Sequence, residues 1–510
     1  MAAPFKEGPA DKKSAVRTAP REEAMGMESA AAAVAGRDAG IDVSDWIDRQ
    51  PVGAFQIRVL LLCAAVVFMD GFDAQAIGYV APSLAKGWAL KPGALGPVFG
   101  AGLAGLMIGA LLLGPVADRV GRKPVIVGST LFFGLCSLAT PAAADLDTLF
   151  WIRFVTGLGL GGAMPNAIAL TSEFSPQRSR ATMITVMFCG FSLGSALGGV
   201  LAARLIPAFG WQVVFYLGGL LPLLLVPVLL VSLPESARLL ALRREPAAAA
   251  GVVALLRRIS PAAAAFDPAR TRFVASHEDN AAGSGGARVG FPIAQLFRNG
   301  RAGATLLLWV MFFMNLLELY FLANWLPTVI NAAGIPETLA IVTTALFQVG
   351  CIVGTLTLGR LIDRWGPYGV LTASYALGGV FTVLIGMAAA SSVWLVMAAT
   401  FGAGLCIVGA QISANAFAAG YYPTRIRSTG VGWALGIGRI GSIVGPVLGG
   451  FMLAAHWHVP AIFAAGALPA LCAASAAFAL GFARFRRASA EAVAAASVAP
   501  EPPAATTAEI

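Results

Sequence analysis

Charged residues are scarce in this 510-residue chain, at 12% of the total, whereas 58% of the residues are hydrophobic. A soluble protein of this length needs many more charges to cover its surface. The composition therefore excludes a soluble globular protein and indicates repeated membrane crossing. The three histidines form no ligand cluster, and the six cysteines stand singly in apolar segments without a CxxC pair. The sequence gives no support for a disulfide scaffold, a metal site or a bound cofactor.

A cleavable signal peptide is missing as well, because the first 50 residues are polar and Ala-rich and contain no apolar core. We expect residues 1–55 and 483–510 to be disordered cytoplasmic tails. Between them are twelve apolar runs of membrane-spanning length, six within 56–233 and six within 303–482. A polar, Arg-rich stretch at 234–302 separates the two sets as a cytoplasmic linker. The sequence thus predicts an all-α membrane protein with twelve transmembrane helices in two six-helix bundles.

The placement of positive charge supports this count of spans. If both termini are cytoplasmic, only Lys86, Lys91 and Arg204 fall in outer loops, and only Arg153 and Arg439 fall within spans. The remaining 30 of the 35 Lys and Arg residues then lie on the cytoplasmic side. This asymmetry is the one that the positive-inside rule requires, and one missing span would remove it.

The two halves also repeat each other in sequence. GPVADRVGRKPV (114–125) and GRLIDRWGPYGV (359–370) share Gly-x3-Asp-Arg-x-Gly at an offset of 245, and SPQRSRAT (175–182) and YPTRIRST (422–429) share Pro-x-Arg-x-Arg at an offset of 247. Each match falls on the same side of the membrane. The sequence therefore predicts two parallel six-helix repeats around a central cavity.

Two carboxylates interrupt the first apolar run, at Asp70 and Asp73 in FMDGFD (68–73). A charge at the centre of a membrane helix costs about 2.5–3.5 kcal/mol on insertion scales, so such groups usually have a function. Two carboxylates one helical turn apart repel each other and can share a proton, which predicts proton coupling. Asp73, nearer the middle of the bilayer, is the first choice for the carrier. The structural alternative is a pair satisfied by interhelical hydrogen bonds.

The seventh run carries a matching polar pair. FMNLLE (313–318) aligns with FMDGFD at an offset of 245, so that Asn315 takes the place of Asp70 and Glu318 that of Asp73. Residues three apart lie on one face of a helix. We therefore expect both helices to present polar faces to the cavity between the halves.

These motifs resemble those of a known transporter family. GPVADRVGRK resembles the loop motif of the major facilitator superfamily, and RFVTGLGLGGAMP (153–165) resembles its fourth-span motif. DGFD, together with NLLELYFLANWLP in the seventh span, is similar to the aromatic acid:proton symporter family, the 4-hydroxybenzoate-type transporters. The resemblance implies a monomeric, multi-pass protein of the bacterial inner membrane that is not an enzyme. It implies proton-coupled import of an organic anion by alternating access, and the expected anion is an aromatic carboxylate such as 4-hydroxybenzoate. The expected partners are this anion, protons and the lipid bilayer, and binding of nucleic acid is not expected.

Arginine stays charged, so each arginine within a span must face a carboxylate, a substrate anion or water. We expect Arg153 to pair with the Asp73 region when substrate is absent and to take part in proton coupling. Arg439 would offer a bidentate fork to a carboxylate substrate. The sequence does not decide which arginine does which, and the alternative for both is a permanent structural ion pair.

Further candidates come from polar and aromatic residues near the pairs and in the repeated loops. Those expected to contact substrate beside Arg439 are Asn315, Glu318, Tyr320, Trp325, Gln411 and Asn415. Those expected to latch the two bundles on the cytoplasmic side are Asp118, Arg119, Arg122, Glu173, Asp363, Arg364 and Arg427. A latch carboxylate would bond a helix N-terminus or an arginine of the other bundle and release it as the bundles rock.

Other functions remain open at this point. LPESARLL (233–240) resembles sugar porters, which keeps a sugar or aliphatic-carboxylate symporter as the nearest alternative. A drug efflux antiporter is disfavoured because GSALGG (194–199) in the fifth span lacks the proline of the efflux motif. A non-transporting membrane sensor is disfavoured by the absence of a recognisable signalling domain. The identity of the acid and the proton stoichiometry are not encoded in any motif.

Overall fold

The computed structural model describes residues 40–243, 246–268, 271–274, 292–298, 300–422 and 426–498. The chain forms two compact units. The larger one comprises Gln56–Ser236 and Gly285–Ile510, and the smaller one comprises Met1–Phe55 and Ala237–Ser284.

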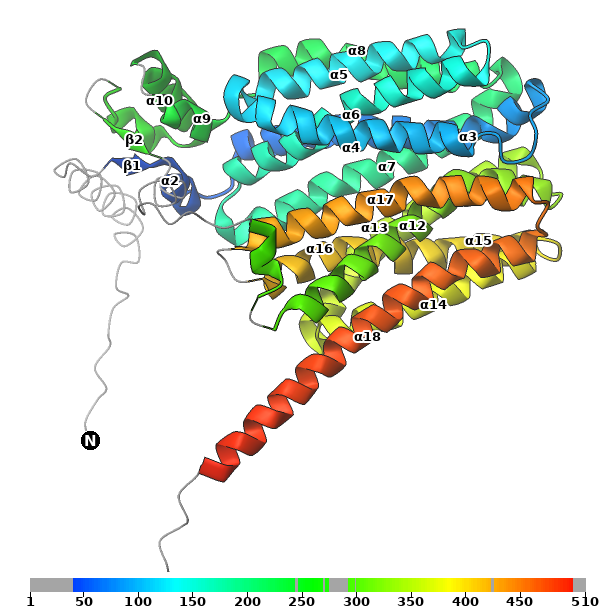
Figure 1. Ribbon diagram of the computed structural model, residues 1–510. Coiled ribbons are helices and arrows are strands. Elements are labelled where there is room, and N and C mark those ends of the chain that lie inside the picture. The colour runs from blue at the N-terminus through cyan, green and yellow to red at the C-terminus, as the bar shows by residue number, and fades with distance from the viewer. Residues whose placement is uncertain are drawn as a thin grey trace, which may run out of the picture. The chain divides into compact units, whose positions relative to one another are not determined.

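The larger unit contains twelve helices that are long and apolar enough to cross a membrane, counted over the described residues. The first six lie together and run from blue to teal in Figure 1: α3 (Ala54–Gly87), α4 (Gly96–Val120), α5 (Arg122–Ala139, extended by η1, Thr140–Ala142), α6 (Leu146–Phe174), α7 (Gln177–Phe209) and α8 (Gln212–Ser232). The second six, preceded by η3 (Pro292–Leu296), are α12 (Ala302–Ala332), α13 (Glu337–Trp365), α14 (Pro367–Ala388), α15 (Val393–Ala403) with η4 (Gly404–Val408) and α16 (Gly409–Tyr421), α17 (Arg427–Ala454) and α18 (Val459–Val498). The predicted all-α membrane fold is confirmed.

Helix ends follow local chemistry. Asp145 caps α6 by accepting a hydrogen bond from the backbone N–H of Thr148 at 2.7 Å, and this bond holds the pKa of Asp145 below its usual range. Gly121 and Gly366, 245 positions apart, end α4 and α13 with φ of 129° and 81°. These angles favour glycine, which is why the repeated loop motif contains it in both copies.

The repeat in the sequence reappears in the helix packing. A Cβ added at Gly105 of α4 would lie 2.0 Å from the carbonyl oxygen of Phe154 in α6. In the second bundle, a Cβ at Gly350 of α13 would lie 2.2 Å from the carbonyl oxygen of Phe401 in α15. Small residues allow this close backbone approach between membrane helices. The two bundles therefore share one backbone arrangement.

The two bundles contact each other at the ends of the helices that lie far from the Asp118 loop. Trp325 of α12 packs edge-on against Phe99 of α4, with 5.0 Å between ring centroids, and is held within its own bundle by donating from Nε1 to the carbonyl oxygen of Pro446 at 2.7 Å. Ser83 of α3 donates to the carboxylate of Glu337 at the start of α13. We call this set of contacts the Glu337 end, and it is closed in the structure.

The smaller unit joins residues from the expected tail and the expected linker. β1 (Ile41–Asp42) pairs in parallel with β2 (Phe273–Val274), and α2 (Val43–Arg49), α9 (Ala237–Leu242), α10 (Pro246–Ile259) and η2 (Pro261–Ala265) complete it. Phe266 packs edge-on against both Trp46 and Phe273, with 6.1 Å between ring centroids in each case. Residues 41–49 thus differ from the disordered tail that composition suggests, because burial of apolar side chains such as Val43 and Ile47 stabilises them.

Candidate functional site

Asp73 and Arg153 form an ion pair inside the first bundle. Arg153 Nη2 lies 3.1 Å from Asp73 Oδ2 and also donates to the Asp73 backbone carbonyl at 3.2 Å. Asp73 is fully buried, and the guanidinium lies over the Phe215 ring, 5.6 Å from its centroid. Because both side chains are buried, each charge requires the other as its partner. The structure contains the pairing expected for Arg153, and the role of that pair in transport stays a prediction.

Asp70 differs from Asp73 although it lies one turn away on the same helix. It is also fully buried, but neither of its carboxylate oxygens has a hydrogen-bond partner among the described residues. The charges that act on it are Arg439 of the second bundle and Asp73. Asp70 therefore interacts electrostatically with a cation of the second bundle, whereas Asp73 is paired within the first bundle.

Arg439 on α17 is the cation that opposes Asp70. Its Nη1 donates to the hydroxyl oxygen of Tyr320 on α12 at 3.3 Å, and its side chain forms no ion pair within 4.0 Å in the described part of the chain. A guanidinium carries five N–H donors in a planar fork, and the contact with Tyr320 uses one nitrogen. The arrangement leaves donors with which Arg439 can bind a carboxylate.

An amide chain connects α12 with α16 inside the second bundle. Asn315 Nδ2 donates to Gln411 Oε1 at 2.6 Å, and Gln411 Nε2 donates to Asn415 Oδ1 at 3.0 Å. Asn315 Oδ1 is buried and has no partner among the described residues. Three of the residues expected to contact substrate are thus brought together, and Asn315 Oδ1 is left as an acceptor without a described donor.

Two others are placed elsewhere. Glu318 lies inside the second bundle, where its Oε1 accepts a hydrogen bond from Thr382 of α14 at 2.9 Å. Trp325 is held at the closed Glu337 end by Pro446 and Phe99. Neither contacts Arg439 or the amide chain, so the structure does not join them to Tyr320, Asn315 and Gln411. Helix periodicity alone could not decide this, because all of these positions on α12 are buried or half-buried.

Arg122 is the centre of the charged loop in the first bundle. Its Nε lies 2.7 Å from Glu173 Oε1 and its Nη2 lies 3.8 Å from Asp118 Oδ1. Its backbone N–H donates to Glu235 Oε1 at 2.9 Å, so that Glu235 caps α5. Ser236 completes the cluster by donating to Glu173 Oε2 at 2.6 Å, while the contacts of Arg119 lie partly outside the described residues. This cluster explains the Pro-Glu-Ser segment at 234–236: it binds the charged loop.

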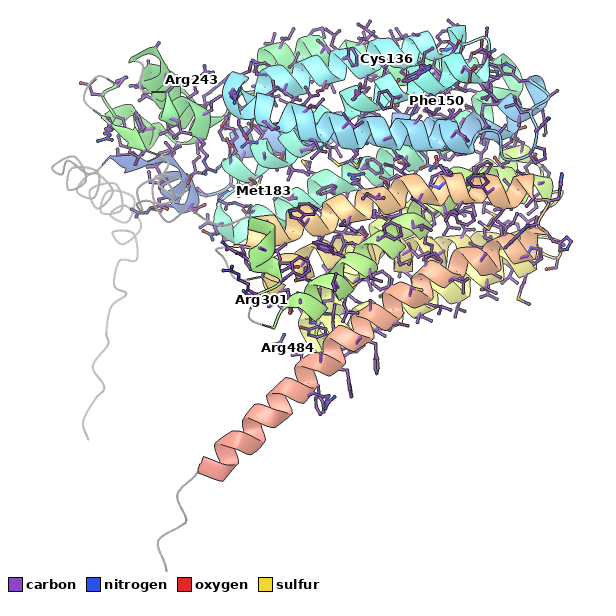
Figure 2. The ribbon with its side chains drawn as sticks, viewed as in Figure 1. Cys136, Phe150, Met183, Arg243, Arg301 and Arg484 are labelled. Atoms are coloured by element: carbon purple, nitrogen blue, oxygen red, sulfur yellow. The ribbon has the colours of Figure 1, made fainter. Side chains whose placement is uncertain are left out.

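The second copy of the loop lacks that cluster. Within the described residues, Asp363 and Arg364 form no ion pair, and the Arg427 side chain lies outside the described part. Asp363 instead lines a cavity of about 740 Å³ together with Tyr368 and Arg484. Figure 2 shows Arg484 near Arg301 at this end of the second bundle. The absence of a basic pair after Arg364 is the sequence signal for this difference.

Sequence reasoning overlooked a glutamine bridge between the bundles. Gln75 of α3 donates from Nε2 to the carbonyl oxygen of Ala323 in α12, and Gln348 of α13 donates to Gln75 Oε1 at 3.4 Å. Both side chains are at least 95% buried. The available signal was an uncharged polar residue two positions after Asp73 in an apolar run. This signal is weak, because an uncharged amide in a membrane helix is less unusual than a carboxylate.

Comparison with known proteins adds independent information. A family model described as Major Facilitator Superfamily matches residues 63–341 and 308–507. The chain is 45% identical to a gallate transporter of Pseudomonas putida, over 88% of this chain and 97% of that protein. It is 42% identical to the 4-hydroxybenzoate transporter PcaK of Pseudomonas aeruginosa, over 86% of this chain and 95% of that protein. The structure resembles a partially occluded inward-open conformation of the Escherichia coli xylose transporter XylE, with a TM-score of 0.61 and 15% identity over 82% of this chain and 97% of that one.

Proposed function

Because the chain belongs to the major facilitator superfamily and is a membrane transporter, we propose that it imports a hydroxylated aromatic carboxylate together with protons across a bacterial inner membrane. Its relatives are named for gallate and 4-hydroxybenzoate, which share a benzoate carboxylate and ring hydroxyls. Both chemical groups have counterparts among the polar residues between the bundles. The carboxylate matches Arg439, and the hydroxyls match the amide chain from Asn315 to Asn415.

The observation that carries this proposal is that Asp70 is buried without a hydrogen-bond partner among the described residues, while Arg439, the cation of the second bundle that acts on it, forms no described ion pair. Asp70 is buried without a hydrogen bond, so its negative charge depends on the positive charge of Arg439. When a substrate carboxylate occupies the guanidinium of Arg439, Asp70 loses that compensation. A buried carboxylate without a counter-charge takes up a proton instead. Anion and proton then bind together, which is the requirement for symport.

This mechanism assigns the proton to Asp70 and not to Asp73, the first choice from sequence. Arg153 contacts both carboxylate oxygens of Asp73 inside the first bundle, Oδ2 from Nη2 at 3.1 Å and Oδ1 from Nη1 at 3.4 Å, so that this carboxylate already has a cation as its partner. Its role here is to hold α3 against α6, so that Asp70 faces Arg439. Asp70 then binds the proton, and Asp73 stabilises the packing of α3 against α6.

Alternating access supplies the rest of the cycle. The bundles are in contact at the Glu337 end through Ser83 with Glu337 and through Phe99 with Trp325. With both termini cytoplasmic, as the positive charges require, this closed end faces the periplasm. Rocking of one bundle against the other would break these contacts and expose Asp70 and Arg439 to the opposite side.

Uptake of labelled 4-hydroxybenzoate and gallate into inverted or reconstituted vesicles tests the proposal. The parent should accumulate substrate when the side from which it is taken up is made acidic, and an uncoupler should abolish accumulation. Asp70→Asn should lose accumulation but keep exchange of labelled for unlabelled substrate, because the amide cannot release a proton. The exposed Asp147→Asn serves as the control and should behave like the parent. Accumulation by Asp70→Asn at the parental level would refute the assignment.

A further inference from the structure

Glu318 is a second carboxyl buried in a span, and the transport scheme above does not use it. The side chain is fully buried inside the second bundle. Its Oε1 accepts a hydrogen bond from Thr382, whereas its Oε2 has no partner among the described residues. A buried carboxyl with one oxygen unsatisfied requires an explanation.

The first bundle shows what Glu318 lacks. Glu318 occupies the position of Asp73 at the offset of 245, and the residue at the position of Arg153, at the offset of 247, is Thr400. The helix contacts at Gly105 and Gly350 establish that the two bundles share this geometry. The buried hydroxyl of Thr400, like Oε2 of Glu318, has no partner among the described residues. A neutral hydroxyl has therefore replaced the cation that compensates Asp73.

Among the described residues, no cation forms an ion pair with Glu318. α14, α15, η4 and α16 contain no Lys, Arg, Asp or Glu, and α13 and α18 carry such residues only near their ends. On α17, the mid-helix charge is Arg439, which bonds Tyr320 and acts on Asp70. The titratable group that interacts with Glu318 is Tyr375 of α14, whose buried hydroxyl also lacks a described partner. A carboxylate in these surroundings would be an isolated buried charge, whereas a carboxylic acid would not.

We propose that Glu318 is a second proton-binding site of this transporter, loaded in the conformation described here and emptied during the transport cycle. The proposal rests on the proton-coupled import proposed above. Thr382 donates to one carboxyl oxygen, and a proton bound to the other oxygen makes that oxygen a hydrogen-bond donor. Asn315, the first residue of the amide chain, lies one turn away from Glu318 on the same helix, α12. One proton on Asp70 and one on Glu318 would make entry of a monovalent anion carry a net positive charge.

The test counts protons per substrate in proteoliposomes that contain a pH-sensitive dye. The full-length protein, Glu318→Gln and the exposed control Asp147→Asn are compared with labelled 4-hydroxybenzoate as the probe. We expect Glu318→Gln to take up one proton fewer per substrate and to keep substrate exchange. At a pH difference of about one unit, each proton contributes about tenfold to the accumulation ratio, so Glu318→Gln should accumulate about tenfold less. Asp147→Asn should match the parent.

The outcomes separate the two proposals. An unchanged proton count in Glu318→Gln, beside a coupled parent, would overturn the role of Glu318 and leave proton-coupled import intact. A parent that takes up no protons would overturn both. If Glu318→Gln does not fold, Thr382→Val keeps the carboxyl and removes the hydrogen bond to it. This variant should keep the proton count and move the pH at which uptake is half-maximal, and an unmoved pH profile would then overturn the proposal.

Discussion

The two bundles of this transporter have the same helix packing but compensate their buried carboxyls differently. In the first bundle, Asp73 lies 3.1 Å from Arg153. In the second, Glu318 meets the hydroxyl of Thr382, and Thr400 stands where the arginine would be. The same helix packing thus holds a carboxyl paired with an arginine in the first bundle and a carboxyl bonded to a hydroxyl in the second. The two halves differ at this position in the charge of the residue that faces the carboxyl, and not in backbone geometry.

Removing the arginine of the first bundle should have the largest effect. Arg153→Met leaves Asp73 buried without its cation, and breaking a buried ion pair in this way destabilises a protein by about 3–5 kcal/mol. Denaturant titration in detergent micelles would measure the loss. Thr400→Val, the matched change in the second bundle, removes a hydroxyl that has no described partner and should cost far less. Equal losses in the two variants would mean that the two sites do not differ in charge.

The second-largest effect is expected from altering Arg439 of α17. Arg439→Lys keeps the charge but loses the planar fork, and hydrogen bonds to charged groups contribute about 1.5–3 kcal/mol. Half-saturation for uptake should therefore require about 10- to 100-fold more substrate, while the exposed Arg204→Lys should have no effect. An amide analogue of the substrate should also compete poorly with the acid. Equal competition by amide and acid, with normal uptake by Arg439→Lys, would favour a neutral substrate such as a sugar.

The shared packing gives a prediction in which the bundles should agree. Gly105→Ala and Gly350→Ala would each press a methyl group against a carbonyl oxygen of the neighbouring helix, and overpacking of this kind costs about 1–3 kcal/mol. Gly114→Ala and Gly359→Ala form the control pair, because a Cβ at either position meets nothing within 4 Å. They should be neutral or slightly stabilising, since alanine favours a helix more than glycine does. A loss confined to one bundle would contradict the common geometry.

The sequence predicted the fold better than it predicted the site. Hydropathy, positive charge and the repeated loops were sufficient for twelve helices in two groups, because each of these signals is local and recurs many times. The position of a side chain around a membrane helix is different. Every face of α12 is apolar apart from a few residues, so the hydrophobic pattern could not tell that Asn315 meets α16 while Glu318 meets α14. The repeat does contain a signal: Thr400 lies 247 positions after Arg153, so Glu318 lacks the arginine that its counterpart Asp73 has.

The smallest effect on stability is expected in the charged loops, where the effect on transport should still be visible. Asp118 lies 3.8 Å from Arg122 and its side chain is 70% exposed, so the pair should contribute no more than about 1 kcal/mol to folding. Asp118→Asn should therefore unfold like the parent.

The effect of Asp118→Asn on transport should be larger if Asp118 acts as a latch. A change of about 1 kcal/mol in the free-energy difference between the inward- and outward-open states alters their ratio about fivefold, which would slow turnover without weakening substrate binding. Asp363→Asn should slow turnover less, because its loop has no counterpart of the cluster around Arg122. Turnover and binding can be separated by comparing uptake rates with equilibrium binding of labelled substrate to the purified protein. Equal slowing in both variants would show that the two loops act alike despite their different contacts, and a loss of binding affinity would place Asp118 in a role other than latching.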